Sequence, residues 1–329
     1  MMYKEGMASL SKVSVVLPVF NGERFLAECI RSVLDQGFEE FELLVSDDGS
    51  TDGSRRVIED FSDARLRIFS QPQNLGLFSN LNFLIRAARY PLVRFLGQDD
   101  VLEAQCLAHE VAFFDRNRSV GMTYSKYVKI DEKGVDKGRT RLHDLPAVIE
   151  ARLSLQLLYY YGCMPGNIST VCVRRECFEE TGLFDETFQA AGDYEMWVRI
   201  CRLRDLGIVH RHLVRLRSHR GQLSRSARLG VPFITEGRRI RQMLLPLLPE
   251  EIRSSAIRFS MLRQNVYDTH LVVRRLLAGR FQDAAGMASA LGTRDLGLGL
   301  LFWLFTINNH LYRPQPRIAL DQRQLLDIG

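Results

Sequence analysis

Residues 93–102 read VRFLGQDDVL, and this stretch decides how the rest of the chain can be organised. The mostly apolar residues 92–96 end at Gly97, which is the pattern of a short buried strand. Asp99 and Asp100 follow at the strand's end, where open α/β sheets bind their ligands. Adjacent carboxylates repel each other unless a cation or donor lies between them, so the pair indicates a hard divalent metal carried by a phosphate ligand. A turn that merely caps a helix from about residue 103 explains the pair equally well.

From residue 13 to residue 117, strand and helix patterns alternate with short connections between them. We expect strands at residues 13–19, 41–46, 66–70 and 92–96, and helices at 23–36, 51–61, 78–88 and 103–117. Four such repeats predict an α/β fold with a doubly wound parallel sheet. The chain has neither a G-x-G-x-x-G after its first strand nor a P-loop, which disfavours nicotinamide dinucleotide enzymes and P-loop NTPases.

The ends of these four predicted strands carry polar residues and glycines. The segments that follow them are residues 18–23 (PVFNGE), 47–53 (DDGSTDG), 74–76 (NLG) and 98–100 (QDD). Parallel strands bring their carboxyl ends to one edge, so the sequence predicts an acidic, glycine-containing pocket there. Each segment alone is also explained as a helix cap or an ordinary turn.

Four stretches together resemble a known family, the inverting family 2 glycosyltransferases with the GT-A fold. They are VSVVLPVFNGERFLAECIRSVLDQ, FELLVSDDGSTDGS, QNLGLFSNLN and FLGQDDVL, and the resemblance covers about residues 12–220. It implies a GT-A catalytic domain over residues 12–225, with a mostly parallel, Rossmann-like sheet flanked by helices. Residues 12–118 would form the half that binds the nucleotide sugar, 119–225 the acceptor half, and 226–329 a helical C-terminal region.

The resemblance also implies roles for individual residues of the donor site. Those expected at the nucleotide sugar are Pro18 and Phe20 at the base pocket, Asn21 and Glu23 near base and ribose, Asp48 at the base edge, Asn74 and Gly76 in the third loop, and Asp99 near the ribose. Asp100 would ligate Mn²⁺ or Mg²⁺, which accepts few protein carboxylates and keeps phosphate oxygens as other ligands. Gln98 departs from the family pattern, because many members have an acidic or small residue there.

Two further segments resemble the acceptor side of the family. Asp193 occupies the position of the general base, the group that takes the acceptor hydroxyl proton; it also fits a helix N-cap, and Glu195 is the alternative base. His219 lies in an R-x-H segment, where it would be a metal ligand or a diphosphate contact, with Arg217 or Arg220 as a phosphate clamp. A surface role for this histidine remains the alternative.

Between Arg199 and Arg241 the sequence holds twelve arginines, opposed only by Asp205 and Glu236. This local excess favours phosphates or an anionic membrane surface, although a solvated face has the same composition. Residues 159–161 (YYY) suit either stacking on a sugar or simple packing. The apolar residues 296–307 are too few to span a bilayer, so we expect a core helix or a helix on the membrane surface, aided by Arg274, Arg275, Arg280 and Arg313.

Composition and cysteine usage limit the class of protein and its cellular compartment. The 329 residues are 46% hydrophobic and 25% charged with a net charge of +5, which is typical of a globular protein. Six cysteines without a C-x-x-C pair, and a polar first dozen residues, predict reduced thiols and a cytoplasmic protein, peripheral on the inner face of the cell membrane if it binds membranes.

The resemblance implies a glycosyltransferase acting on a saccharide or lipid-linked acceptor in polysaccharide or glycolipid synthesis. Two other classes share parts of the pattern: a non-catalytic nucleotide-binding protein and a sugar-phosphate nucleotidyltransferase. The latter needs a Gly-rich basic loop after its first strand, and residues 18–23 have none. Nucleic acid is disfavoured as a partner, because acidic strand ends repel its backbone.

Overall fold

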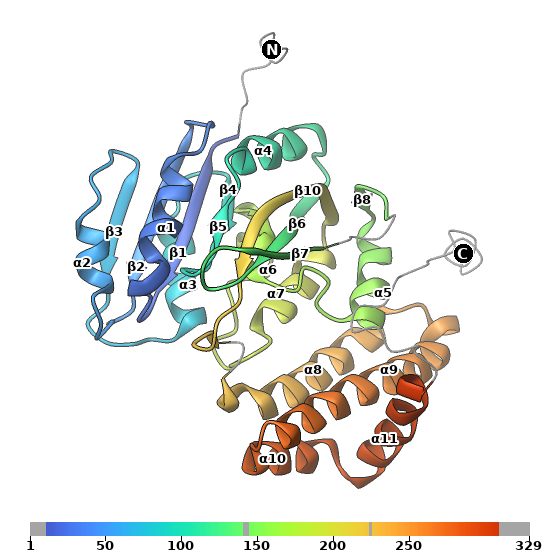
Figure 1. Ribbon diagram of the computed structural model, residues 1–329. Helices are drawn as coiled ribbons and strands as arrows, with labels where there is room; N and C mark the ends of the chain where they lie inside the picture. The colour runs from blue at the N-terminus through green and yellow to red at the C-terminus, as the bar shows by residue number, and fades with distance from the viewer. Residues whose placement is uncertain (1–10, 141–144, 224–225, 309–329) are drawn as a thin grey trace. The chain divides into compact units, whose positions relative to one another are not determined.

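The structure is a computed structural model that describes residues 11–140, 145–223 and 226–308 (Figure 1). The described residues divide into two compact units. The first takes in residues up to 154, then 165–186 and 199–219. The second takes in 155–164, 187–198 and the described residues from 220 onward. The predicted domain boundaries stay predictions, and the second unit contains three segments of the expected acceptor half: residues 155–164, 187–198 and 220–223.

One mixed sheet forms the centre of the first unit, in the order β3-β2-β1-β4-β9-β6-β10-β5 (Figure 1). Its strands, with β7 paired to β6 and β8 to β10, are β1 Val13–Val19, β2 Phe41–Asp47, β3 Leu66–Ser70, β4 Leu92–Phe95, β5 Val101–Leu102, β6 Val120–Ile130, β7 Asp136–Arg139, β8 Val148–Ile149, β9 Val171–Arg174 and β10 Asp205–Arg217. The first four strands in chain order run parallel, as predicted. The other half is mixed, because β9 runs antiparallel to both β4 and β6 while β10 runs parallel to β6.

Helices flank this sheet, which confirms the predicted α/β class. They are α1 Glu23–Leu34, α2 Ser54–Glu59, α3 Leu77–Ala87, α4 Cys106–Arg116, α5 Ala151–Tyr161, α6 Glu176–Thr181 and α7 Gly192–Cys201. β1 is a β-branched run whose residues are buried except for half-buried Pro18, as expected of a central strand covered on both faces. α1 buries the face made by Phe25, Leu26, Cys29, Ile30 and Val33. All of these except Phe25 join side chains of β1, β2 and α4 in one apolar core.

The strand order reverses direction at β1, which lies between β2 and β4. In open α/β sheets, ligands bind at the carboxyl edge where the strand order switches, next to the loops that follow β1 and β4 here. Residues 20–22 and 97–100 are these two loops. The fold thus places the polar strand ends where an α/β sheet binds ligands.

The C-terminal part of the second unit is helical, as predicted. Its helices are α8 Gly230–Leu244, α9 Glu250–Leu277, α10 Phe281–Leu291 and α11 Thr293–Asn308. Ile234, Val272, Ala284, Met287 and Leu291 form the buried centre of the bundle. Within residues 11–140, 145–223 and 226–308, the helices lack the combination of length and hydropathy that a membrane crossing requires. Arg313, expected to aid membrane contact, lies outside the described residues.

Candidate functional site

The loops that follow β1 and β2 are joined by hydrogen bonds between side chains and backbone. Asn21 has a positive φ of 51°, and its backbone amide donates to Ser50 Oγ at 2.9 Å. Its own side-chain oxygen accepts from the Thr51 amide at 2.8 Å. Glu23 Oε2 accepts from the Gly53 amide at 3.0 Å. Asn21 and Glu23, predicted to contact base and ribose, therefore hold the two loops together, and their nucleotide contacts stay predictions.

Asp48 fixes the third loop in the same manner. Its two carboxylate oxygens accept from the amides of Leu75 at 2.8 Å and Gly76 at 3.0 Å. Burial raises the pKa of Asp48, and the two amide hydrogen bonds oppose that rise. Gly76 has a φ of 92°, in the left-handed region that glycine favours. Asn74 is exposed in this loop. The hydrogen bonds of Asp48 thus bring it beside the loop that contains Asn74 and Gly76, the other two residues predicted here at the nucleotide.

Gln98 connects the loop after β4 to the loop after β1. Its side-chain oxygen accepts from the Phe20 amide at 2.8 Å, and its nitrogen donates to the Phe20 carbonyl at 3.0 Å. A side chain at Gly22 would bring a Cβ within 2.5 Å of Gln98 Cδ, so glycine makes room for this pair. The Phe20 ring is exposed next to half-buried Pro18. Gln98 therefore fixes the backbone that presents the predicted base pocket.

We expect Gln98→Glu to weaken nucleotide binding about five- to tenfold. A carboxylate can accept from the Phe20 amide but cannot donate to the Phe20 carbonyl, and a lost hydrogen bond of this kind is worth about 1 kcal/mol. Titration of the wild type and the variant with nucleoside diphosphate measures the change. Gln105→Glu, the same substitution at an exposed position, is the control. Equal affinities of Gln98→Glu and the wild type would show that this pair does not hold the base pocket.

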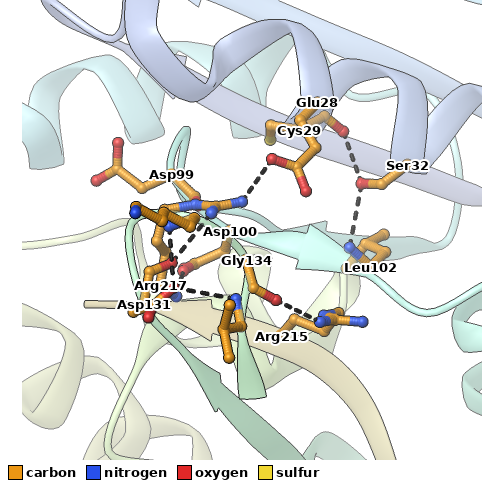
Figure 2. A network of polar contacts seen from close by, with 12 residues as sticks. Glu28, Cys29, Ser32, Asp99, Asp100, Leu102, Asp131, Gly134, Arg215 and Arg217 are labelled. Atoms are coloured by element: carbon orange, nitrogen blue, oxygen red, sulfur yellow. Dashed lines mark hydrogen bonds and ion pairs between the residues drawn. The ribbon is translucent and has the colours of Figure 1, made fainter. Parts of the chain in front are cut away.

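Asp99 and His219 meet beside these loops. His219 Nε2 lies 3.0 Å from Asp99 Oδ2, and the His219 ring packs on Phe25 with centroids 5.0 Å apart. In Figure 2 the Asp99 carboxylate points away from the contacts that surround Asp100 and Arg217. This is the distance of a direct ion pair, and it is also compatible with two ligands of one ion. Asp99 was predicted near the ribose and His219 as a metal ligand, and the structure brings the two together.

Asp100 is more enclosed than its neighbour, with 5% of its surface exposed. Its Oδ2 accepts from Ser169 Oγ at 2.6 Å, and its Oδ1 accepts from the Arg217 amide at 2.9 Å. Burial raises the pKa of Asp100 to about 7 against the effect of these two hydrogen bonds. The metal-ligand role of Asp100 stays a prediction, and its geometry favours instead a residue that anchors the loop.

Arg217 is the cation that holds this loop from within the protein (Figure 2). Its guanidinium donates to the Asp99 carbonyl at 2.9 Å, to the Asp131 carbonyl at 3.2 Å and to Glu28 Oε2 at 2.6 Å. Its centre also lies 4.6 Å from the Phe25 ring. These contacts occupy Arg217 inside the first unit and disfavour it as a phosphate clamp; the clamp role suggested for Arg217 or Arg220 stays a prediction.

Asp193 lies in the first turn of α7, in the second unit, half-buried. Its Oδ1 accepts from the amide of the adjacent Tyr194 at 2.7 Å, whereas an N-cap side chain reaches two or three residues ahead. Burial raises the pKa of Asp193 to about 6, and the charge of Glu236 adds to the rise. The cap interpretation is therefore weakened, and the general-base role stays a prediction. Glu195, the alternative base, is buried on the same helix.

Glu236 of α8 anchors the loop that leads into α7. Its carboxylate accepts from the consecutive amides of Gln189, Ala190 and Ala191 at 2.8, 2.9 and 2.8 Å. Sequence reasoning assigned this residue no role. The available signal was its isolation, since it is one of two acids among twelve arginines.

The three tyrosines of α5 pack within the second unit. Tyr160 and Tyr161 meet Phe259 of α9 with ring centroids 5.3 and 6.2 Å apart. Arg263 lies over the Tyr161 ring at 5.0 Å and donates to the Tyr160 carbonyl at 2.7 Å. These contacts favour the packing interpretation over stacking on a sugar.

Comparison with known proteins agrees with this arrangement. The sequence model of Glycosyl transferase family 2 matches residues 14–179, which is half of the chain. The chain belongs to glycosyl transferase family 2. The matched region contains the loops after β1 to β4, while Asp193 and His219 lie beyond it.

Relatives of this family 2 glycosyltransferase include uncharacterized glycosyltransferases of Rickettsia felis and Rickettsia prowazekii. The first is 27% identical over 219 residues and the second 26% identical over 220, each across 65% of this chain. The match spans 35% of the Rickettsia felis protein and 66% of the Rickettsia prowazekii protein. The chain thus corresponds to about a third of the first relative and two thirds of the second.

Solved structures of S. aureus TarS share the fold. TarS in complex with UDP superposes with a TM-score of 0.58 at 20% identity, over 74% of this chain and 69% of the TarS chain. A further TarS structure superposes with a TM-score of 0.61 at 19% identity, over 87% of this chain and 50% of that TarS chain. These likenesses support the GT-A architecture of the sheet and its helices.

Proposed function

We propose that this family 2 glycosyltransferase moves a sugar from a nucleotide-diphospho-sugar donor to an acceptor hydroxyl, with inversion at the anomeric carbon. The observation that carries the proposal is the pairing of Asp99 with His219 at the carboxyl edge of the sheet. The pair lies in the same unit as the loops fixed by Gln98 and Asp48. The exposed Phe20 ring offers a stacking surface for a base.

We propose Asp99 and His219 as the residues that hold Mn²⁺ or Mg²⁺, in place of Asp100. Among the residues that the structure describes, three or more His, Cys, Asp or Glu side chains do not gather into a metal cluster. A two-residue site suits a metal that keeps phosphate oxygens and water as its remaining ligands. When bound, the ion would offset the negative charge that develops on the leaving diphosphate.

The chain's own residues supply the acid–base step. Asp193 accepts the proton of the acceptor hydroxyl as that oxygen attacks the anomeric carbon, and the bond from this carbon to the diphosphate oxygen breaks on the opposite face. A single displacement of this kind inverts the anomeric centre. The loop before α7, held by Glu236, keeps the start of this helix in place.

The similar proteins suggest a donor to test first, and we also propose an acceptor and a cellular location. TarS has been crystallised with UDP and with UDP-GlcNAc, so we propose a uridine diphospho-sugar as the first donor to test. The acceptor would be a saccharide or a lipid-linked saccharide of a cell-surface polysaccharide or glycolipid. The enzyme would then work in the cytoplasm, peripherally on the inner face of the membrane.

A thermal-shift panel of UDP, GDP, dTDP, CDP and ADP, each with and without Mn²⁺, tests the donor site. A nucleotide at about 100 times its dissociation constant stabilises the fold by about 2.7 kcal/mol. We expect one nucleotide to raise the melting temperature, and to do so only with the metal. Absence of a shift with all five would contradict the proposed donor site. Binding of the matching nucleotide sugar without turnover would instead favour a non-catalytic binding protein.

A further inference from the structure

The turn between α9 and α10 exposes large apolar side chains. Leu277 is 83% exposed and Phe281 is 68% exposed, separated by Ala278, Gly279 and Arg280. Gly279 has a φ of 72°, which lets the chain reverse within this short connection. Folding therefore leaves two large apolar side chains in water at one corner of the bundle.

Phe281 also lines a shallow apolar hollow with a volume of about 200 Å³. α9 contributes Val273 and Leu276, α10 contributes Phe281 and Ala285, and α11 contributes Leu300. Figure 1 shows these three helices packed side by side. The described side chains that line the hollow are all apolar. Phe281 belongs to both the exposed turn and the hollow, and so joins them in one apolar surface. We name this surface the α9–α10 corner and define it by the side chains of Val273, Leu276, Leu277, Phe281, Ala285 and Leu300.

Three arginines neighbour these apolar residues along the chain. Arg274, Arg275 and Arg280 lie in or next to the turn, and Asp283 is the single acid between residues 269 and 294. Arg274 and Arg280 are exposed, whereas Asp283 is half-buried. Exposed apolar side chains with exposed cations beside them match the boundary between the acyl chains and the phosphates of an anionic bilayer.

We propose that the α9–α10 corner is the surface by which this protein docks on an anionic membrane. Leu277 and Phe281 enter the acyl boundary, the hollow accommodates the end of an acyl chain, and the arginines bind lipid phosphates. A second copy of the chain is a poorer occupant, since a two-fold contact through this patch would bring the arginines of both copies together. This proposal names the surface for the membrane contact offered above and does not depend on the transfer reaction.

Vesicle co-sedimentation of the full chain tests the proposal without any donor. We expect binding to phosphatidylcholine vesicles that contain about one-third phosphatidylglycerol, and weak binding to phosphatidylcholine alone. The double variant Leu277→Ser/Phe281→Ser should bind at least about tenfold more weakly. Arg274→Gln/Arg280→Gln should lose about fivefold per arginine, mainly at low salt. Leu203→Ser, at a 52% exposed leucine of the first unit, and Arg118→Gln are the matched controls.

Three results would overturn the proposal. They are failure of the wild type to bind the anionic vesicles, equal binding by the double variant, and light scattering that shows a dimer which the double variant abolishes. The nucleotide thermal shift of the same variants is read in parallel. Because both substituted side chains are exposed, we expect that shift to be unchanged, so loss of vesicle binding and failure of the donor site are distinguished.

Discussion

Asp193→Asn is expected to lower kcat about 10²- to 10⁴-fold while leaving nucleotide binding unchanged, once a donor has been identified. Asparagine has the same shape and can still accept from the Tyr194 amide through its side-chain oxygen. It cannot take up a proton, so it removes general-base catalysis, whose usual contribution is of this size. The measurement is a comparison of kcat, donor KM and nucleotide affinity between the wild type and the variant.

The pH dependence gives this prediction a second readout. Burial, followed by the charge of Glu236, raises the pKa of Asp193 to about 6. The carboxylate is the active form, so kcat/KM should be constant above this pKa and fall as the pH drops through about 6. The residual activity of Asp193→Asn should lack that acidic limb. An unchanged limb in the variant would show that another group titrates.

Glu195→Gln is the control within the same helix. Glu195 is the second carboxylate at the start of α7 and is buried. If Asp193→Asn retains transfer and Glu195→Gln abolishes it, the role of base passes to Glu195. Melting temperatures of both variants separate this outcome from a general loss of folding.

The first half of the sheet was predictable because its strands are locally encoded. β1 reads as a nearly continuous apolar run, and β2 has apolar residues at 41 and 43–45. The residues of both strands are buried apart from half-buried Pro18. Each also ends in residues whose polarity contrasts sharply with the strand. The carboxyl edge of the sheet, and most of the residues at it, follow from that contrast.

β10 was not predicted, although it is a thirteen-residue strand between β6 and β5. Its sequence, DLGIVHRHLVRLR, interrupts the apolar pattern with two histidines and three arginines. Arg217 is buried in it because its partners are Glu28 and the carbonyls of Asp99 and Asp131. These partners lie 86 to 189 residues away along the chain. A pattern read within a short window contains no sign of them.

Contacts within the fold also account for part of the excess of arginines, while its suggested role in binding phosphates or a membrane stays a prediction. Arg199 donates to the carbonyls of Thr181 and Leu183, and Arg238 pairs with Asp295 at 2.7 Å. These arginines, like Arg217, hold the protein's own segments. The composition gives the number of positive charges. It does not show which arginines already bind carbonyl or carboxylate groups of the same chain.

The adjacent carboxylates Asp99 and Asp100 provide the second large expected effect. We expect Asp99→Asn to remove the Mn²⁺-dependent part of nucleotide binding while the unliganded protein melts as the wild type does. Asp99 and His219 face each other at 3.0 Å, and the Asp99 side chain is partly exposed. Replacing the anionic ligand by a neutral amide weakens the attraction for a hard cation. The measurement is the nucleotide thermal shift with and without metal.

Asp100→Asn should show the opposite pattern. Both oxygens of Asp100 accept hydrogen bonds, and an asparagine would turn an amide toward either Ser169 Oγ or the Arg217 amide. Toward the Arg217 amide this leaves two donors facing each other, and toward Ser169 Oγ it leaves the hydroxyl proton without its acceptor. Either loss costs about 1–3 kcal/mol, so the unliganded protein should melt at a lower temperature. Its response to metal should persist at temperatures where the variant is folded. If instead Asp100→Asn lost the metal response and Asp99→Asn kept it, Asp100 would be the ligand, and Asp99 would return to the ribose position that the sequence suggested.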